Sequence, residues 1–292
     1  MLVFVAIVSF AIVTINVLLL IGNKKTDYSG YNTGGEKVGV IELVGIISES
    51  KTILEKIKRF RNDKSVKAIV LRIDSPGGSV GPSQEIFREI RKTIKKKKVI
   101  ASMGSVAASG GYYVAAAADG IIANPGTITG SIGVIMGFTN YQKILEKVGL
   151  VPVVVKSCEY KDIGSPVREM SEKEAEILQN LADGIHNQFV NAIARGRNIE
   201  KNKVASFADG RIFSGQEAKE LGLVDRLGNL EDAVEWAGRM AGIKGEVSSV
   251  YIKDKKFSLI KYIAESSIKK LVYRITYPSL SAEYIYLPEK QQ

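Results

Sequence analysis

The chain has 292 residues, with 41 Lys and Arg against 31 Asp and Glu, and a formal net charge of +10. Its 45% hydrophobic and 25% charged residues are the balance of a folded protein, which excludes wholesale disorder. A single cysteine, Cys158, excludes an internal disulfide, and a single histidine, His186, argues against most metal hydrolases, which need two or three imidazoles. The basic residues are spread along predicted helices, so we expect a solvated surface and no nucleic-acid partner.

The first predicted element is an uncharged apolar run at residues 2–21. A helix of this length spans about 30 Å, the hydrocarbon thickness of a bilayer. Because the run lacks a basic n-region and a small-x-small cleavage site, we expect a retained single-pass anchor (residues 1–22) rather than a cleaved signal peptide. Two lysines follow the run and by themselves favour a cytoplasmic domain, but long domains cross membranes largely regardless of charge, so orientation stays open. Residues 23–37, rich in Gly, Ser and Asn, are predicted to be a flexible tether.

Between residues 38 and 243, strand-like apolar runs alternate with amphipathic helices. This alternation is typical of an α/β fold with a mostly parallel sheet and helices packed outside it. The expected strands are 38–47, 67–73, 99–103, 120–123, 131–136 and 152–156. The expected helices are 52–61, 83–97, 110–118, 141–148 and 171–195, the last opened by a Ser171/Glu174 capping box.

Residues 244–292 are predicted to be a C-terminal extension. Its basic, moderately amphipathic segment 257–273 fits three roles: lying on a membrane, docking on a neighbouring subunit, or covering its own core. The apolar segment 284–288 is a candidate for strand addition to a partner.

Two glycine-rich loops carry the candidate chemistry. In residues 74–79 (DSPGGS), paired glycines allow positive φ angles and present backbone N–H groups to an anion. Ser109 precedes a short helix starting near Gly110, where free N–H groups and the helix dipole favour a developing negative charge. Such a serine is either a plain N-cap or a nucleophile beside an oxyanion hole. The upstream glycine loop, which can supply a second N–H, favours the nucleophile.

A serine nucleophile needs a base. His186 lies inside the long predicted helix, and we interpret it as structural. Lys161 lies in a loop after an apolar run, and burial there would lower the pKa of its amine and let it accept the serine proton. The alternative is an ordinary lysine facing solvent.

Five segments resemble the short form of signal peptide peptidase A, a family of membrane-anchored serine proteases with a Ser/Lys dyad. They match in order and spacing from about residue 38 to 240, and they are LRIDSPGGSV, SMGSVAASGGYYVAAAAD, TGSIGVIM, YKDIGSP and ADGRIFSGQEAKELGLVD. The resemblance implies that Ser109 is the nucleophile and Lys161 the general base. It further implies that Ser131 orients the lysine amine, and that Gly78 and Gly110 form the oxyanion hole.

The same resemblance implies a crotonase/ClpP-like spiral of ββα units and a homo-oligomeric ring or dome, with the dyad formed between adjoining subunits. Substrates would be signal peptides left in the bilayer, with small and apolar side chains near the scissile bond. The protease domain would be extracytoplasmic, the C-terminal tail would be able to enter a neighbour's active site, and no metal or organic cofactor would be needed.

Three alternatives stay open at the level of sequence. The first is a NfeD/stomatin-type ClpP-class membrane protease, against which the YKDIGSP loop argues. The second is a crotonase-like acyl-CoA enzyme, which would need acid/base carboxylates near its oxyanion hole. The third is a non-enzymatic membrane scaffold, in which Ser109 is only a helix cap.

Overall fold

The computed structural model describes residues 28–29, 36–252 and 283–285. The predicted anchor, most of the predicted tether (all but residues 28–29 and 36–37) and the amphipathic segment 257–273 lie outside these residues. Within the described ranges, no helix combines the length and apolarity needed to cross a membrane.

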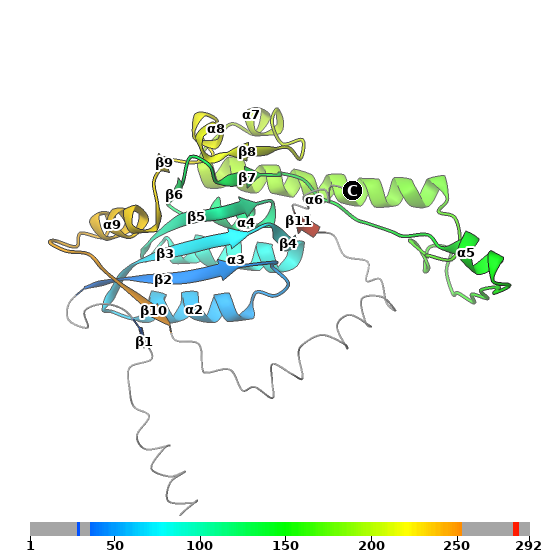
Figure 1. Ribbon diagram of the computed structural model, residues 1–292, viewed down its shortest axis with the longest axis horizontal. Helices are drawn as coiled ribbons and strands as arrows, with labels where there is room; N and C mark the ends of the chain where they lie inside the picture. Colours follow the sequence, from blue (N-terminus) through cyan, green and yellow to red (C-terminus); the bar gives the residue numbers. More distant parts are fainter. Residues whose placement is uncertain (1–27, 30–35, 253–282, 286–292) are drawn as a thin grey trace, which may run out of the picture.

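The strands form the centre of the molecule (Figure 1). They are β1 (Tyr28–Ser29), β2 (Lys37–Val44), β3 (Val66–Ser75), β4 (Gly77–Ser79), β5 (Lys98–Ala108), β6 (Gly120–Ala123), β7 (Ile128–Gly130), β8 (Ile212–Ser214), β9 (Arg226–Leu227), β10 (Ser248–Ile252) and β11 (Glu283–Ile285). Nine of the described strands form one sheet whose main path is β1-β10-β2-β3-β5-β6-β9, with β7 pairing β5 and β8. The pairs from β10 to β9 along this path are parallel, as the α/β prediction requires.

Helices cover both faces of the sheet (Figure 1). They are α2 (Lys51–Asn62), α3 (Val80–Thr93), α4 (Gly110–Ala115), α5 (Gln142–Lys147), α6 (Glu172–Arg197), α7 (Lys201–Ala205), α8 (Gly215–Glu220) and α9 (Leu230–Met240).

Successive residues of a strand point to opposite faces, so the apolar run of β3 feeds two cores. Ile69 and Leu71 lie in the larger core, with apolar residues of α2, α3, α4 and α6. Ala68 and Val70 lie in the smaller core beneath α9. The continuous apolar strand is thus buried from both sides.

The long predicted helix is confirmed as α6, and its capping box is formed as expected: Ser171 and Glu174 exchange side-chain and backbone hydrogen bonds. Two predicted strands are wrong. Residues 131–136 do not continue β7, because Gly130 (φ 78°) and Ser131 (φ 49°) turn the chain out of the sheet. Residues 152–156 are irregular, since no described strand lies beside them to pair with.

Residues 137–170, which we call the arm, include α5 and project past the body beside the N-terminal part of α6 (Figure 1). The arm carries many exposed apolar side chains; Val151, Val153 and Val155 are 84%, 86% and 96% exposed. A contiguous exposed apolar stretch of this kind marks an interaction surface in soluble domains.

Candidate active site

Ser109 stands at the junction between β5 and α4, and it is 1% exposed. Its backbone has φ 51° and ψ −117°, a conformation that costs a non-glycine residue about 1–3 kcal/mol. Two hydrogen bonds hold it there: its N–H donates to the Gly130 carbonyl at 2.8 Å, and its carbonyl accepts from the Tyr113 N–H at 2.8 Å. Strain that the surrounding structure maintains in this way concentrates at functional sites.

The N-terminus of α4 is brought close to the DSPGGS loop because Gly111 has no side chain. A Cβ on Gly111 would lie 2.8 Å from the Ser75 carbonyl oxygen, so the helix could not approach the end of β3. Gly110, the first residue of α4, presents one of the N–H groups that are left without intrahelical partners at a helix start.

Gly78 lies in β4 between Gly77 and Ser79, and the backbone of Ile47 forms hydrogen bonds with both of these residues. The Ile47 N–H donates to the Gly77 carbonyl at 2.8 Å, and the Ser79 N–H donates to the Ile47 carbonyl at 2.8 Å. Because alternate residues of a strand direct their N–H and C=O groups to opposite edges, those of Gly78 point to the other edge of β4.

That other edge is the one on which β11 lies. The two strands are antiparallel, with Tyr284 opposite Gly78, and β11 also runs beside α4 (Figure 1). Residues 283–285 of the tail therefore do add as a strand, and they do so within the chain itself. This edge accepts an extended peptide.

Ser131 follows Gly130, the residue whose carbonyl holds the Ser109 N–H. Ser131 is 9% exposed, and its own N–H donates to the Arg211 carbonyl at 2.8 Å. The fold thus brings Ser109, Gly110 and Ser131 into one neighbourhood, with Gly78 on the adjacent strand β4.

Lys161 lies elsewhere, in the arm. Its side chain is exposed, and among the described residues no hydrogen bond or ion pair joins it to Ser109, Ser131 or any other side chain. One chain by itself does not assemble the predicted dyad in this conformation.

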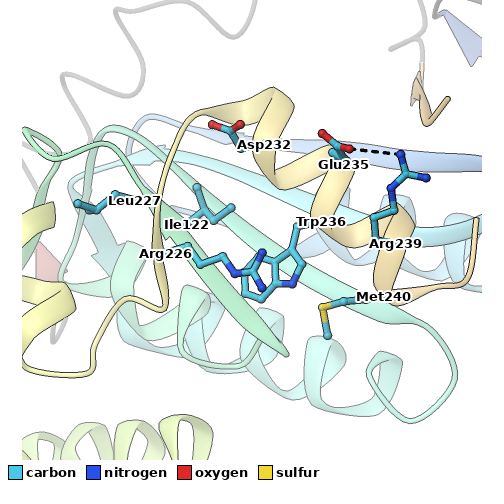
Figure 2. Close-up of a pocket in the computed structure, with 8 residues that line it drawn as sticks. All are labelled: Ile122, Arg226, Leu227, Asp232, Glu235, Trp236, Arg239 and Met240. Atoms are coloured by element: carbon cyan, nitrogen blue, oxygen red, sulfur yellow. Dashed lines mark hydrogen bonds and ion pairs between the residues drawn. The ribbon is translucent and has the colours of Figure 1, made fainter. Parts of the chain in front are cut away.

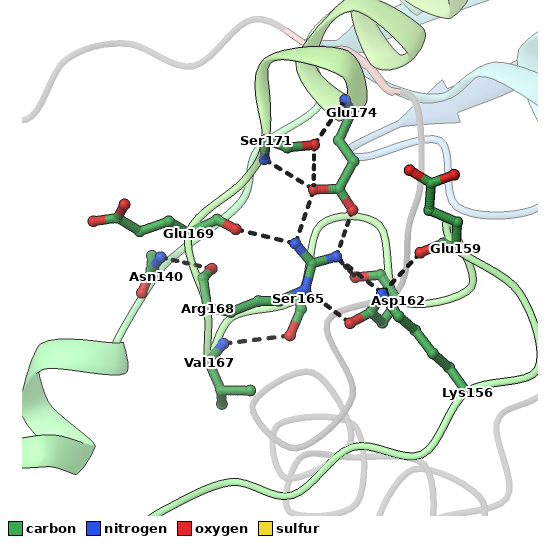
Figure 3. Close-up of polar contacts among 10 residues, drawn as sticks. All are labelled: Asn140, Lys156, Glu159, Asp162, Ser165, Val167, Arg168, Glu169, Ser171 and Glu174. Carbon is green, nitrogen blue, oxygen red and sulfur yellow. Dashed lines mark hydrogen bonds and ion pairs between the residues drawn. The ribbon is translucent and has the colours of Figure 1, made fainter.

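The loop that carries Lys161 is nevertheless anchored, by Arg168 (Figure 3). The Arg168 guanidinium donates to the Asp162 carboxylate from Nε at 2.8 Å and to the Glu174 carboxylate from Nη1 at 2.8 Å. These bonds lower the pKa of Glu174 to about 2 and hold the pKa of Asp162 well below its usual range. Lys156 adds a 2.6 Å ion pair to Asp162. The loop is thereby tied to the N-terminus of α6.

His186 lines the same cavity as Ser131, a neighbour that the helix pattern around His186 does not indicate. It lines a cavity of about 320 Å³ whose wall includes Ser131 and, one and two turns earlier on α6, Asp183 and Gln179. The spacing of these three polar residues places them on one face of the helix. The sequence therefore shows that Gln179, Asp183 and His186 share one face of α6, but it does not show which part of the fold that face packs against.

A larger hollow, about 670 Å³, lies at the far edge of the sheet between β6, β9 and α9 (Figure 2). There the Arg226 guanidinium stacks over the Trp236 ring, 4.2 Å from its centroid, and Arg239 pairs with Glu235 at 3.3 Å. β9 ends the main sheet path on this side, and neither Ser109 nor Ser131 lines this hollow.

Comparisons with known proteins show which family the chain belongs to. The model of peptidase family S49 matches residues 91–244, and the Clp protease model matches residues 39–127. The chain is 50% identical, over 71% of its length and 76% of the relative's, to a Synechocystis protein named as a protease, slr0021.

Two further relatives carry related names. An Enterococcus faecium protein named as a signal peptide peptidase, SppA, is 42% identical over 63% of this chain, which spans about half (54%) of that relative. The Arabidopsis thaliana serine protease SPPA, chloroplastic, is 35% identical over 73% of this chain and 34% of its own length. With a serine fixed in a strained turn at a helix N-terminus, and with these matches, the chain belongs to peptidase family S49 and is an SppA-like serine peptidase.

Proposed function

We propose that the chain cleaves peptides by acyl transfer, with Ser109 as nucleophile and Lys161 as general base. The observation that carries the proposal is the position of Ser109: buried, strained, and at the start of α4 beside a strand edge that accepts an extended peptide. Ser131 serves to orient the lysine amine. The backbone N–H groups of Gly78 and Gly110 bind the oxyanion.

In the first step, the neutral amine of Lys161 takes the proton of Ser109 as Oγ attacks the peptide carbonyl. The resulting oxyanion accepts hydrogen bonds from the two N–H groups, and loss of one such donor typically costs about 10²–10³ in rate. The tetrahedral intermediate then expels the amine of the leaving peptide, which takes the proton back from the Lys161 ammonium. Water, deprotonated by the same lysine, attacks the acyl-enzyme. The bond from the acyl carbon to Ser109 Oγ then breaks, Oγ takes the proton from the Lys161 ammonium, and the second product leaves with its new carboxyl group.

Lys161 comes, in this proposal, from a neighbouring copy of the chain. In one chain the lysine is exposed on a projecting arm, and no hydrogen bond joins it to Ser109 or Ser131. The arm's exposed valines provide an apolar surface that a second copy would cover. Burial in that interface would desolvate the amine and favour its uncharged form. The assembly is proposed to be a homo-oligomeric ring or dome.

The proposed substrates are signal peptides left after cleavage and related hydrophobic peptides, bound as an extra strand on β4 in the place of β11. The apolar run at residues 2–21 is proposed as a membrane anchor, with the protease domain on the extracytoplasmic side. Together these features would hold the site next to peptides that reside in a bilayer.

A mixing experiment tests the dyad and its division between chains. We expect Ser109→Ala and Lys161→Ala each to abolish cleavage of a fluorogenic hydrophobic peptide, whereas Lys147→Ala, an exposed lysine of the arm, retains it. Because a shared site takes serine from one copy and lysine from another, co-assembly of the two inactive variants should restore part of the activity. Full turnover by Lys161→Ala would refute the dyad, and an inactive co-assembly would refute the sharing.

A further inference from the structure

The parallel ladder between β3 and β5 is interrupted just before the two strands reach the candidate site. Two residues along β3, from Ile73 to Ser75, correspond to four residues along β5, from Met103 to Ala107. Strand β5 therefore carries two extra residues between these partners, an irregularity of the β-bulge kind. Bulges are over-represented next to active sites, where they re-aim a side chain. This one ends two residues before the proposed nucleophile.

The side chain of Asp74 fills the interruption. Its Oδ1 atom accepts a hydrogen bond from the Val106 N–H, in the bulged stretch of β5, at 3.1 Å. The carboxylate lies directly against Gly104, where an added Cβ would be 2.8 Å from Asp74 Cγ and 2.9 Å from Oδ2. Asp74 is half-buried, and within the described ranges no cation pairs with it. The bond to the Val106 N–H is therefore the main polar contact of this carboxylate.

The backbone around Asp74 holds the other half of the site. The Asp74 carbonyl accepts from the Gly45 N–H at 2.9 Å, which fixes the chain just after β2. The next residue, Ser75, accepts with its Oγ from the Gly77 N–H at 3.1 Å and so shapes the turn into β4. Asp74 thus joins the segment that carries Gly78 to the strand that carries the nucleophile, at the point where the ladder between them is interrupted.

We propose that Asp74 is a positioning residue for peptide cleavage: its carboxylate supports the bulge of β5 and so sets the distance between Ser109 Oγ and the Gly78 N–H. The inference rests on the proposed function and adds the residue that holds two of its groups in place. A displacement of about 1 Å in a reacting group can cost about 10²-fold in rate. Since the peptide would bind on β4, whose bonds to Ile47 do not involve Asp74, the effect falls on kcat and not on KM.

Three variants test this role with a fluorogenic hydrophobic peptide. Asp74→Ala should lower kcat by about 10-fold to 10²-fold, with KM close to the wild-type value. Asp74→Asn keeps an oxygen that can accept from the Val106 N–H, and it should recover most of that loss. Gly104→Ala leaves the carboxylate intact but displaces it, so kcat should fall as in Asp74→Ala. This third variant keeps the test valid if Asp74→Ala fails to fold.

The matched control is Asp119→Ala, near the other end of β5. The Asp119 carboxylate accepts from the Val99 N–H at 2.8 Å, so this variant removes the same kind of hydrogen bond from the same strand. It should destabilise the chain in urea as Asp74→Ala does and leave kcat unchanged. An equal loss of kcat in both alanine variants would overturn the positioning role. So would a wild-type kcat in Asp74→Ala or Gly104→Ala, or an asparagine variant no more active than the alanine variant.

Hydrogen exchange on the Ser109→Ala chain separates this inference from the proposed function. Without turnover, the Val106 N–H should exchange faster in Ser109→Ala/Asp74→Ala than in Ser109→Ala, whereas Ser109→Ala/Asp74→Asn should exchange as slowly as Ser109→Ala. Equal exchange in all three chains would overturn the inference. Cleavage that persists in Ser109→Ala would overturn the catalytic proposal, and the exchange pattern would still decide whether Asp74 holds the bulge.

Discussion

Gly78→Ala is the substitution whose cost is most directly readable from the structure. An added Cβ would lie 2.3 Å from the Ile47 carbonyl oxygen and 2.6 Å from the Ile47 nitrogen, whereas real Cβ atoms essentially never come within 3.0 Å of another heavy atom. Ile47 is a core residue, 2% exposed, so it has no open space to move into. The φ angle of 154° is one that side-chain-bearing residues rarely adopt.

The magnitude follows from three contributions. Overpacking a well-packed core costs about 1–3 kcal/mol. Backbone strain at a disfavoured φ adds about 1–3 kcal/mol. The two hydrogen bonds between Ile47 and β4 contribute about 1 kcal/mol each and would be weakened. Since these contributions overlap, we expect about 3–5 kcal/mol in total, a large part of the about 5–15 kcal/mol that stabilises a typical domain.

Urea unfolding of the full-length chain measures this cost, with Gly81→Ala as the matched control. Gly81 lies in the first turn of α3, and nothing is within 4 Å of an added Cβ there. Alanine at Gly81 should therefore be neutral or stabilise by up to about 1 kcal/mol. We also expect Gly78→Ala to lose peptidase activity, because the peptide-accepting edge of β4 is displaced. A free energy of unfolding for Gly78→Ala within about 1 kcal/mol of wild type, or a urea midpoint above that of Gly81→Ala, would refute the packing argument.

Two further predictions concern polar groups. The hydrogen bonds from Arg168 hold the carboxyl pKa of Glu174 at about 2, below its ordinary value of 4.5. The stabilisation from this pair is therefore present above about pH 4.5 and is lost as the pH falls toward 2. Cleavage of the arm by an added protease should rise over that window in the wild type and should be high at every pH in Arg168→Leu. The Tyr112 side chain is fully buried, and its hydroxyl donates to the Leu223 carbonyl at 3.0 Å. Tyr112→Phe should therefore lower the free energy of unfolding in urea by about 1–2 kcal/mol with an unchanged m value. A cost near zero would show that the Leu223 carbonyl finds another partner.

Local sequence alone determined much of the framework. The apolar runs of β2, β3, β5 and β6 predict a parallel sheet because both faces of each strand must be buried. The Ser171/Glu174 box marks the start of α6 because side-chain capping depends only on residues three apart. The serine before paired glycines points to a strand-to-helix turn, where Ser109 is found.

Tertiary structure decided what local pattern could not. The valine-rich run at 151–155 has strand propensity, but a strand needs a neighbour, and in this chain the run lies exposed on the arm. Lys161 and Ser109 are separated by 52 positions, and whether the two meet depends on where the arm lies and on what covers it. His186 looked like an ordinary helix residue because a helix pattern shows which residues share a face, and only the packed fold shows that this face opposes Ser131 across a cavity.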